Sequence, residues 1–174
     1  MQRTIYVYEL QLKKWKSAKY TEPLSYEDDV VEIMSKVAQR DIKAKTQDIP
    51  QDRKILYIDA VNYDKEARLL KLTFISARYG VVRRVINTET FADRGILKEK
   101  PDGDLERTHI MLKFVENAVA IGLYEYNRDG IGFSKIITYM NEYVKLYHAK
   151  ENDTVKYGIT AKNLVSRDFL NALE

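Results

Sequence analysis

The amino-acid sequence predicts a single α+β domain: one mostly antiparallel sheet of five to seven strands, two main helices packed on it and a short C-terminal helix. Three observations support this class. Short segments alternate apolar and polar residues between turn residues, as half-buried strands do. Two longer segments repeat apolar residues at helical spacing. The 174 residues are 45% hydrophobic, with seven glycines and three prolines, which is enough apolar material for one core over residues 1–174.

One stretch, Leu105–Tyr147, combines strand propensity, turn residues and helical periodicity better than any other. It reads as two strands and a helix separated by two turns: Leu105–Phe114, Glu116-Asn117, Ala118–Tyr126, Asn127–Gly130 and Phe133–Tyr147. We therefore expect this unit to be the nucleus of the fold.

Alternation within this unit predicts which side chains face the core. The expected apolar face of the two strands consists of Ile110, Leu112, Phe114, Val119, Ile121 and Leu123. The opposite face of the second strand has only Ala118, Ala120 and Gly122, as is found where another backbone approaches closely. The expected buried stripe of the helix consists of Phe133, Ile136, Ile137, Met140, Val144 and Tyr147.

The remaining elements are expected on either side of this unit. Tyr6, Tyr8, Leu10 and Leu12 share the inward face of a strand over Thr4–Leu12. Ser25 begins a helix with a near capping box, and its apolar stripe is Val30, Ile33, Met34 and Val37. The other expected elements are strands at Ile55–Val61, Leu69–Ala77 and Val155–Ile159, a weakly structured stretch at Asn87–Lys100 and a helix at Leu164–Leu173.

Composition excludes several function classes. The chain has no cysteine, which excludes disulfides, thiolate metal sites and cysteine nucleophiles. A net charge of +3 is well short of the strongly basic balance of a dedicated nucleic-acid binder. No signal-peptide pattern and no segment of membrane-spanning length is present, so we expect a cytoplasmic protein without a membrane partner. Thirteen tyrosines are compatible with sheet faces and with interfaces.

The most basic short segment runs from Arg78 to Arg84. Arg78, Arg83 and Arg84 around Tyr79 are the residue types that bind phosphates while a ring stacks on a base, although an exposed strand end with solvated arginines has the same composition. We take these four residues as the first candidates for partner or nucleic-acid binding. Lys98 and Arg128 are weaker additions.

No catalytic motif accompanies this segment. The phosphate-binding patterns G-x-x-x-x-G-K-[ST] and G-x-G-x-x-G are absent, and His109 and His148 have no second histidine at ligand spacing. We therefore expect no catalytic residue, no metal and no cofactor. One enzymatic alternative remains open: a small metal-dependent nucleic-acid-processing enzyme whose carboxylates converge only in the fold.

The central unit resembles a group of phage and prophage proteins in which a strand runs into an Asn-Arg-x-Gly turn and a helix of the type I-x-x-Y-[LM]-N. Here the matching residues are Asn127-Arg128-Asp129-Gly130 and Ile136 to Asn141, within residues 54–147. The group is similar to the N-terminal regions of phage-exclusion and Kiwa-type anti-phage proteins. The resemblance implies a mobile-element protein that works in phage–host conflict through binding, and its motifs carry no catalytic residue.

Together these observations predict a non-enzymatic binding protein, acting in defence or anti-defence, whose partner is a protein complex or a nucleic acid. The apolar helix that runs bluntly to Glu174 leaves two further readings open. One is that the chain is the N-terminal part of a longer protein. The other is a structural homo-oligomer, such as a homodimer, that pairs through this helix and surface tyrosines.

Overall fold

The computed structural model describes residues 4–16, 19–23, 27–80, 82–99, 102–116, 119–148 and 155–164. Its strands are β1 (Thr4–Lys16), β2 (Lys19–Pro23), β3 (Gln47–Ile49), β4 (Lys54–Asp64), β5 (Leu69–Arg78), β6 (Arg83–Ile86), β7 (Asp93–Lys98), β8 (Asp104–Glu116), β9 (Val119–Tyr126) and β10 (Val155–Asn163). Its helices are α1 (Glu27–Ala38), α2 (Ile42–Lys45), the 3-10 turn η1 (Pro50–Asp52) and α3 (Phe133–His148).

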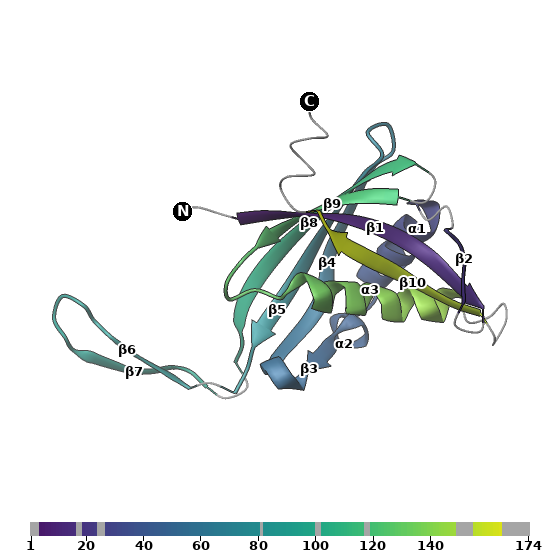
Figure 1. Cartoon of the computed structure of the whole chain (residues 1–174). Coiled ribbons are helices and arrows are strands. Elements are labelled where there is room, and N and C mark those ends of the chain that lie inside the picture. The colour runs from purple at the N-terminus through teal and green to yellow at the C-terminus, as the bar shows by residue number, and fades with distance from the viewer. Residues whose placement is uncertain are drawn as a thin grey trace, which may run out of the picture.

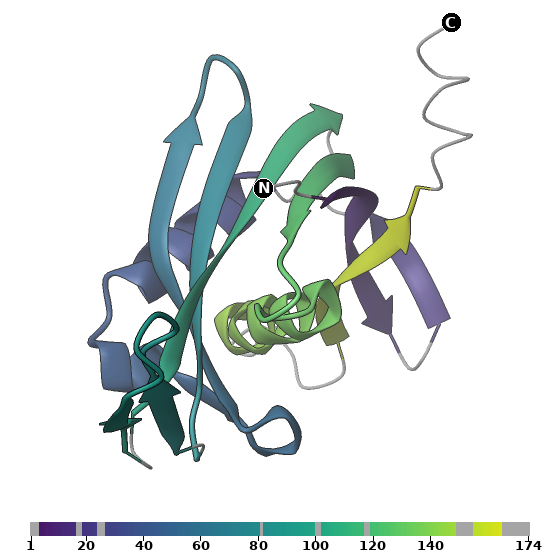
Figure 2. The same ribbon diagram turned by 90° about the vertical axis from the view of Figure 1, so that its left-hand side faces the viewer.

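The main sheet is antiparallel and curls around α3. Its strand order is β10-β1-β9-β8-β5-β4-β3, with β2 paired to β1, while β6 and β7 form a separate two-stranded sheet. Figures 1 and 2 show the strands passing around α3, which lies inside the curl. Helix α1 contacts β4 and α3, and α3 also contacts β10. The core therefore lies between the concave face of the sheet and these two helices.

The predicted α+β class and mostly antiparallel sheet are confirmed, but the helix count and packing differ from the prediction. The short helix α2 is additional, and α3 is enclosed by a curled sheet instead of lying on an open one. Ser25 and most of the expected helix Leu164–Leu173 lie outside the described residues. Leu164 itself continues beyond β10 and donates its N–H to the Val7 carbonyl, at 2.9 Å.

The predicted inward face of β9 is wrong. Ile110, Leu112 and Phe114 of β8 are buried as expected. Their partners across the ladder are Tyr124, Gly122 and Ala120, and opposite residues of an antiparallel pair point to the same side. Leu123 is therefore on the convex face, where it is 37% exposed.

Gly122 is required by close packing on the concave face. A Cβ atom at this position would lie 2.6 Å from Leu10 Cδ1 and 3.2 Å from Leu112 Cδ2, two buried side chains on the neighbouring strands. The small face that the sequence predicted thus exists. It turns toward the core, and the side chains of β1 and β8 fill the space above it.

Tyrosines complete the buried face of α3. Ile136, Met140 and Val144 are fully buried as predicted, whereas Tyr147 is 37% exposed. Tyr139, outside the predicted stripe, is fully buried. Its hydroxyl donates to the Lys45 carbonyl at 2.8 Å and accepts the Ile58 N–H at 3.3 Å. This hydroxyl joins α3 to α2 and to β4.

Asn141 connects the same helix to the edge of the sheet. Its side-chain amide donates to the Ile159 carbonyl at 2.9 Å and its oxygen accepts the Ile159 N–H at 2.5 Å. The amide thereby satisfies both backbone groups of a residue on β10, the last strand of the sheet order. Edge strands expose such groups, so Asn141 also covers part of this edge.

The first turn of α1 is fastened to the β4–β5 hairpin through Glu27. Arg68 donates to the Glu27 carboxylate from Nε at 2.9 Å and from Nη2 at 2.6 Å, and the Tyr63 hydroxyl donates to the other oxygen. The hydrogen bonds from Arg68 hold the pKa of the Glu27 carboxyl below its usual value, and the hydrogen bond to Glu27 raises the pKa of Tyr63 to about 12. Glu27 therefore has a structural use, alongside the helix-dipole role expected for the acidic first turn.

Replacing Tyr139 with Phe should destabilise the fold. The substitution leaves the ring in place but removes the hydrogen bonds of the buried hydroxyl to Lys45 and Ile58. We expect a loss of about 1–3 kcal/mol in the free energy of unfolding, measured by urea denaturation. Tyr147→Phe is the matched control, because its hydroxyl bonds Glu32 at an exposed site. Equal stability of both variants would contradict this role of Tyr139.

The Glu27 contact should make stability depend on pH. A carboxyl whose pKa is lowered by folding stabilises the protein above its unfolded value, near 4.5, and this stability is lost as the pH falls through the folded value. Glu27→Gln should therefore unfold at lower urea than the wild type at neutral pH, with the difference shrinking in acid. Asp59→Asn, at an exposed carboxyl of β4, is the control. A Glu27→Gln deficit that stays constant with pH would contradict the assignment.

Candidate functional site: the projecting β6–β7 arm

The chain between β5 and β8 forms an arm that projects from the body of the protein. We define the arm as β6, β7 and the loop between them, residues 83–98. Figure 1 shows it extending from the ends of β5 and β8 away from the curled sheet. The prediction of weak structure over Asn87–Lys100 is therefore wrong, because β7 occupies Asp93–Lys98. Five of the six predicted binding residues lie on this arm or at the strand end that leads to it.

Lys98 holds the base of the arm. It is only 7% exposed, and its ammonium donates to the Asp104 carboxylate at 2.8 Å and to the Arg78 carbonyl at 3.1 Å. These bonds connect β7 to the start of β8 and the end of β5. A lysine used in this way is a structural residue, so its predicted contact with a partner is not supported.

Tyr79 is also part of the base. Its hydroxyl donates to Asp48 Oδ1 at 2.7 Å, which raises its pKa, and its N–H donates to the Arg53 carbonyl at 2.9 Å. The ring is thus held against the loop around η1 and is only partly exposed. Arg78 beside it is exposed at the end of β5.

The arginines of the arm differ in their availability. Arg84 is exposed and forms an ion pair with Asp93 across the hairpin. The side chain of Arg83 lies outside the described part of the structure, although its backbone pairs with Lys98. The arm therefore positions Arg84 next to a carboxylate, which weakens the attraction of its guanidinium for a phosphate.

The tip of the arm is an ordered turn. Asn87 Oδ1 accepts the N–H groups of Glu89 and Thr90 at 2.8 and 2.9 Å, and the Asn87 carbonyl accepts the N–H of Phe91 at 2.8 Å. Phe91 has a φ of 54°, a left-handed conformation that is uncommon for an aromatic residue. Its side chain is 78% exposed. The turn thus presents a phenylalanine to solvent at the end of the arm.

Apolar side chains continue along both strands of the arm. Ile86 is 55% exposed on β6, and Ile96 is 58% exposed on β7. Val82 and Val85 are exposed as well. A two-stranded ribbon without a covering layer has no core of its own. Exposed aromatic and aliphatic residues grouped on one element are typical of interaction sites.

The arm carries a small positive charge. Residues 83–98 contain four basic residues, Arg83, Arg84, Arg94 and Lys98, and two acidic residues, Glu89 and Asp93. Two of the basic residues are already paired with carboxylates. The electrostatic attraction for a phosphate backbone is correspondingly small.

Arg128, the sixth predicted residue, lies on the turn between β9 and α3. The turn is held by Lys54, whose ammonium donates to the carbonyls of Asp129 and Gly130 at 2.6 and 2.5 Å. Lys54 is also the ladder partner of Arg78, so the turn lies at the end of the sheet from which the arm leaves. Arg128 itself is exposed. The structure places it near the base of the arm and gives it no role in holding the turn.

The sequence analysis missed the apolar residues of the arm. Phe91, Ile86 and Ile96 follow neither a strand alternation nor a helical period, because no core lies beneath them to impose one. The available signal was an aromatic residue and isoleucines inside a stretch of otherwise polar composition. The sequence also gave no sign of a tyrosine-lined cavity beside α3.

Comparison of the chain with models of protein families, with curated proteins and with solved structures found no match. The resemblance to phage and prophage proteins therefore stays a prediction. Within the described ranges, no three histidine or carboxylate side chains come close enough to bind a metal ion together. The helices in the same part of the chain are too short or too polar to cross a membrane.

Replacing Lys98 with Met should loosen the arm without unfolding the body. The variant removes the ammonium that joins β7 to Asp104 and Arg78. We expect the arm to open about tenfold more often, seen as faster tryptic cleavage at Arg84 and Arg94, with an unchanged melting temperature. Lys71→Met, at an exposed lysine of β5, is the control. Unchanged cleavage in the Lys98 variant would show that this ammonium does not hold the arm.

Proposed function

We propose that this is a non-enzymatic binding protein that contacts another protein through the β6–β7 arm. The observation that carries the proposal is the exposure of Phe91, Ile86 and Ile96 on a hairpin outside the main sheet. Both strands of the hairpin are edge strands, so a partner strand can add to either side while its side chains contact the apolar residues.

A protein partner fits the arm better than a nucleic acid. Nucleic-acid sites combine a surplus of basic groups with stacking rings. Here the arm has only two more basic than acidic residues, Arg84 is paired with Asp93, and Tyr79 is held at the base by Asp48. Interfaces between proteins instead place apolar and aromatic groups at their centre and charges at the rim.

The resemblance of the central unit to phage and prophage proteins supports phage–host conflict as the setting of this binding. It leaves the direction, defence or anti-defence, to experiment. The grouping of exposed Ile86, Phe91 and Ile96 on one projecting hairpin is consistent with a protein that acts by binding another.

The proposal is tested by recovering partners from phage-infected and uninfected cells with tagged protein. Phe91→Ser combined with Ile96→Ser should reduce the recovered partner at least tenfold, because aromatic and aliphatic contacts at an interface centre carry most of its affinity. The matched control, Ile42→Ser with Leu146→Ser, changes two residues of similar exposure on helices and should recover the partner normally. Equal recovery by both doubles would overturn the proposal.

A charge-reversal pair separates the protein partner from a nucleic acid. Arg83→Glu with Arg84→Glu should change recovery less than the apolar double, and nuclease treatment should leave recovery intact. Loss of binding with a reduced salt dependence in this variant, together with nuclease sensitivity, would instead show nucleic-acid binding. Metal-dependent loss of DNA or RNA on incubation would support the enzymatic alternative.

A further inference from the structure

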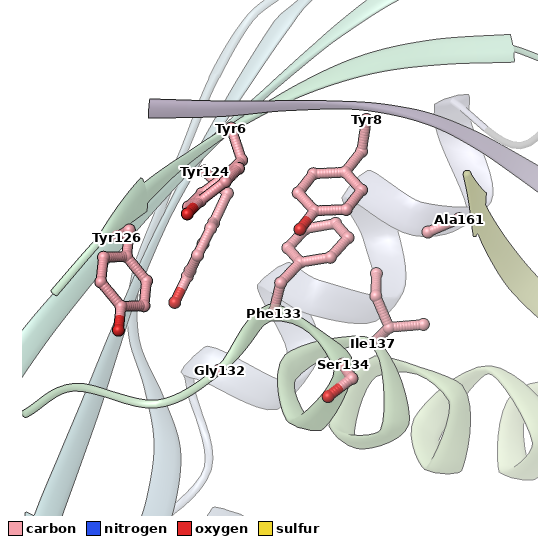
Figure 3. A pocket seen from close by; sticks show the side chains of 9 residues that line it. All are labelled: Tyr6, Tyr8, Tyr124, Tyr126, Gly132, Phe133, Ser134, Ile137 and Ala161. Carbon is pink, nitrogen blue, oxygen red and sulfur yellow. The ribbon is translucent and has the colours of Figure 1, made fainter. Parts of the chain in front are cut away.

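A tyrosine-lined cavity of about 510 Å³ lies between the start of α3 and the concave face of β1 and β9. Figure 3 shows the rings of Tyr6, Tyr8, Tyr124 and Phe133 gathered above the first turn of the helix. Among the residues that the structure describes, the lining consists of Tyr6, Tyr8, Tyr124, Tyr126, Gly132, Phe133, Ser134, Ile137 and Ala161. Cavities of this volume accommodate small organic ligands.

The strand register creates this cavity. Tyr6 pairs with Tyr124 across the β1–β9 ladder, and Tyr8 pairs with Gly122. Opposite residues point to the same face, so the tyrosines all face α3. The space above Gly122 is filled by Leu10 and Leu112. The cavity therefore lies on the other side of Tyr8, between the tyrosine rings and the start of α3.

The rings are already organised by contacts among themselves. Tyr8 stacks on Phe133 with centroids 3.8 Å apart and planes 15° apart. The ring of Tyr6 packs edge to face on Tyr126, with ring centroids 5.8 Å apart. The centroids of Tyr6 and Tyr124 are 6.4 Å apart, and their ring planes differ by 26°. Rings held in this way lose little entropy when a ligand binds.

The polar groups of the cavity are hydroxyls. None of its nine lining residues is charged at neutral pH. The Tyr124 hydroxyl is already used, because it donates to the Ile131 carbonyl at 2.7 Å. Burial raises the pKa of Tyr124 to about 12 and also raises that of Tyr8, so both hydroxyls keep their protons. The other hydroxyls at the cavity belong to Tyr6, Tyr126 and Ser134.

This lining disfavours a cationic ligand. Aromatic walls attract cations, but no carboxylate of the described residues lines the cavity to complete such a site. The N-terminal end of α3, with its partial positive charge and no acidic residue in its first turn, borders the same space. An uncharged or anionic ligand is therefore preferred over an ammonium compound.

We propose that the cavity binds a planar aromatic ring compound of the nucleobase type, which stacks against the tyrosine rings and exchanges hydrogen bonds with their hydroxyls. This small-molecule site is separate from the arm and does not depend on the function proposed for it.

The test is a titration of the protein with adenosine and with AMP. Binding is measured by calorimetry or by chemical-shift changes of the residues that line the cavity. Both probes should bind saturably to the wild type. Tyr6→Leu should weaken this binding about tenfold or more, because it removes one half-exposed stacking ring. Tyr147→Leu removes a tyrosine of similar exposure outside the cavity and should bind both probes as the wild type does.

A second variant blocks the cavity without removing a ring. The added Cβ of Gly132→Leu meets no atom within 4 Å, so the larger side chain can be accommodated at the cavity's edge and should abolish binding. Melting temperatures confirm that each variant is folded. Phe91→Ser, on the arm, should bind both probes normally. The proposal is overturned if the wild type binds neither adenosine nor AMP, if Tyr147→Leu loses as much affinity as Tyr6→Leu, or if choline binds more tightly than both.

Discussion

The attachment of α3 inside the curled sheet is the constraint on which the rest of the structure depends. Tyr139 fixes the helix to α2 and β4, and Asn141 fixes it to the edge strand β10. Because β10 at one end of the sheet and β4 near the other end are both bonded to one helix, the sheet must curl to reach it. The curl in turn brings the inward face of β1 over the first turn of α3, where the tyrosine-lined cavity forms.

These contacts also explain the motif on which the resemblance to phage and prophage proteins was based. Tyr139 and Asn141 are the Y and the N of its helical part, and both bond backbone groups of other elements. In its turn, Asn127 Oδ1 accepts the Asp129 N–H at 3.1 Å, and a Cβ at Gly130 would lie 3.0 Å from Thr108 Oγ1. The motif therefore describes how the helix is held, and functional residues have to be sought elsewhere.

Sequence periodicity correctly predicted the buried faces of elements that pack against the core on one side. It failed for β9, where the pairing of strands sets which side chains face inward, and for the arm. The stripe of α1, including Ile33 and Met34, is buried as predicted, since one face of this helix meets the core. On β9, the register of the pairing with β8 places Gly122 on the inward face and the more hydrophobic Leu123 on the outward face. The arm left no periodic signal because none of the elements that the structure describes forms a layer over it. The site that we propose overlaps the predicted segment Arg78–Arg84, but it relies on exposed apolar groups where the sequence suggested cations.

The central claim is that the arm binds a protein while the body supports it. Its most direct test places a photo-crosslinking amino acid at position 91 or at position 42 and irradiates phage-infected cells. Position 91 is at the tip of the arm, and position 42 is an exposed isoleucine on α2. The account predicts a discrete protein crosslink from position 91 and none from position 42. Crosslinks from position 42 alone, from both positions equally or from neither would contradict it.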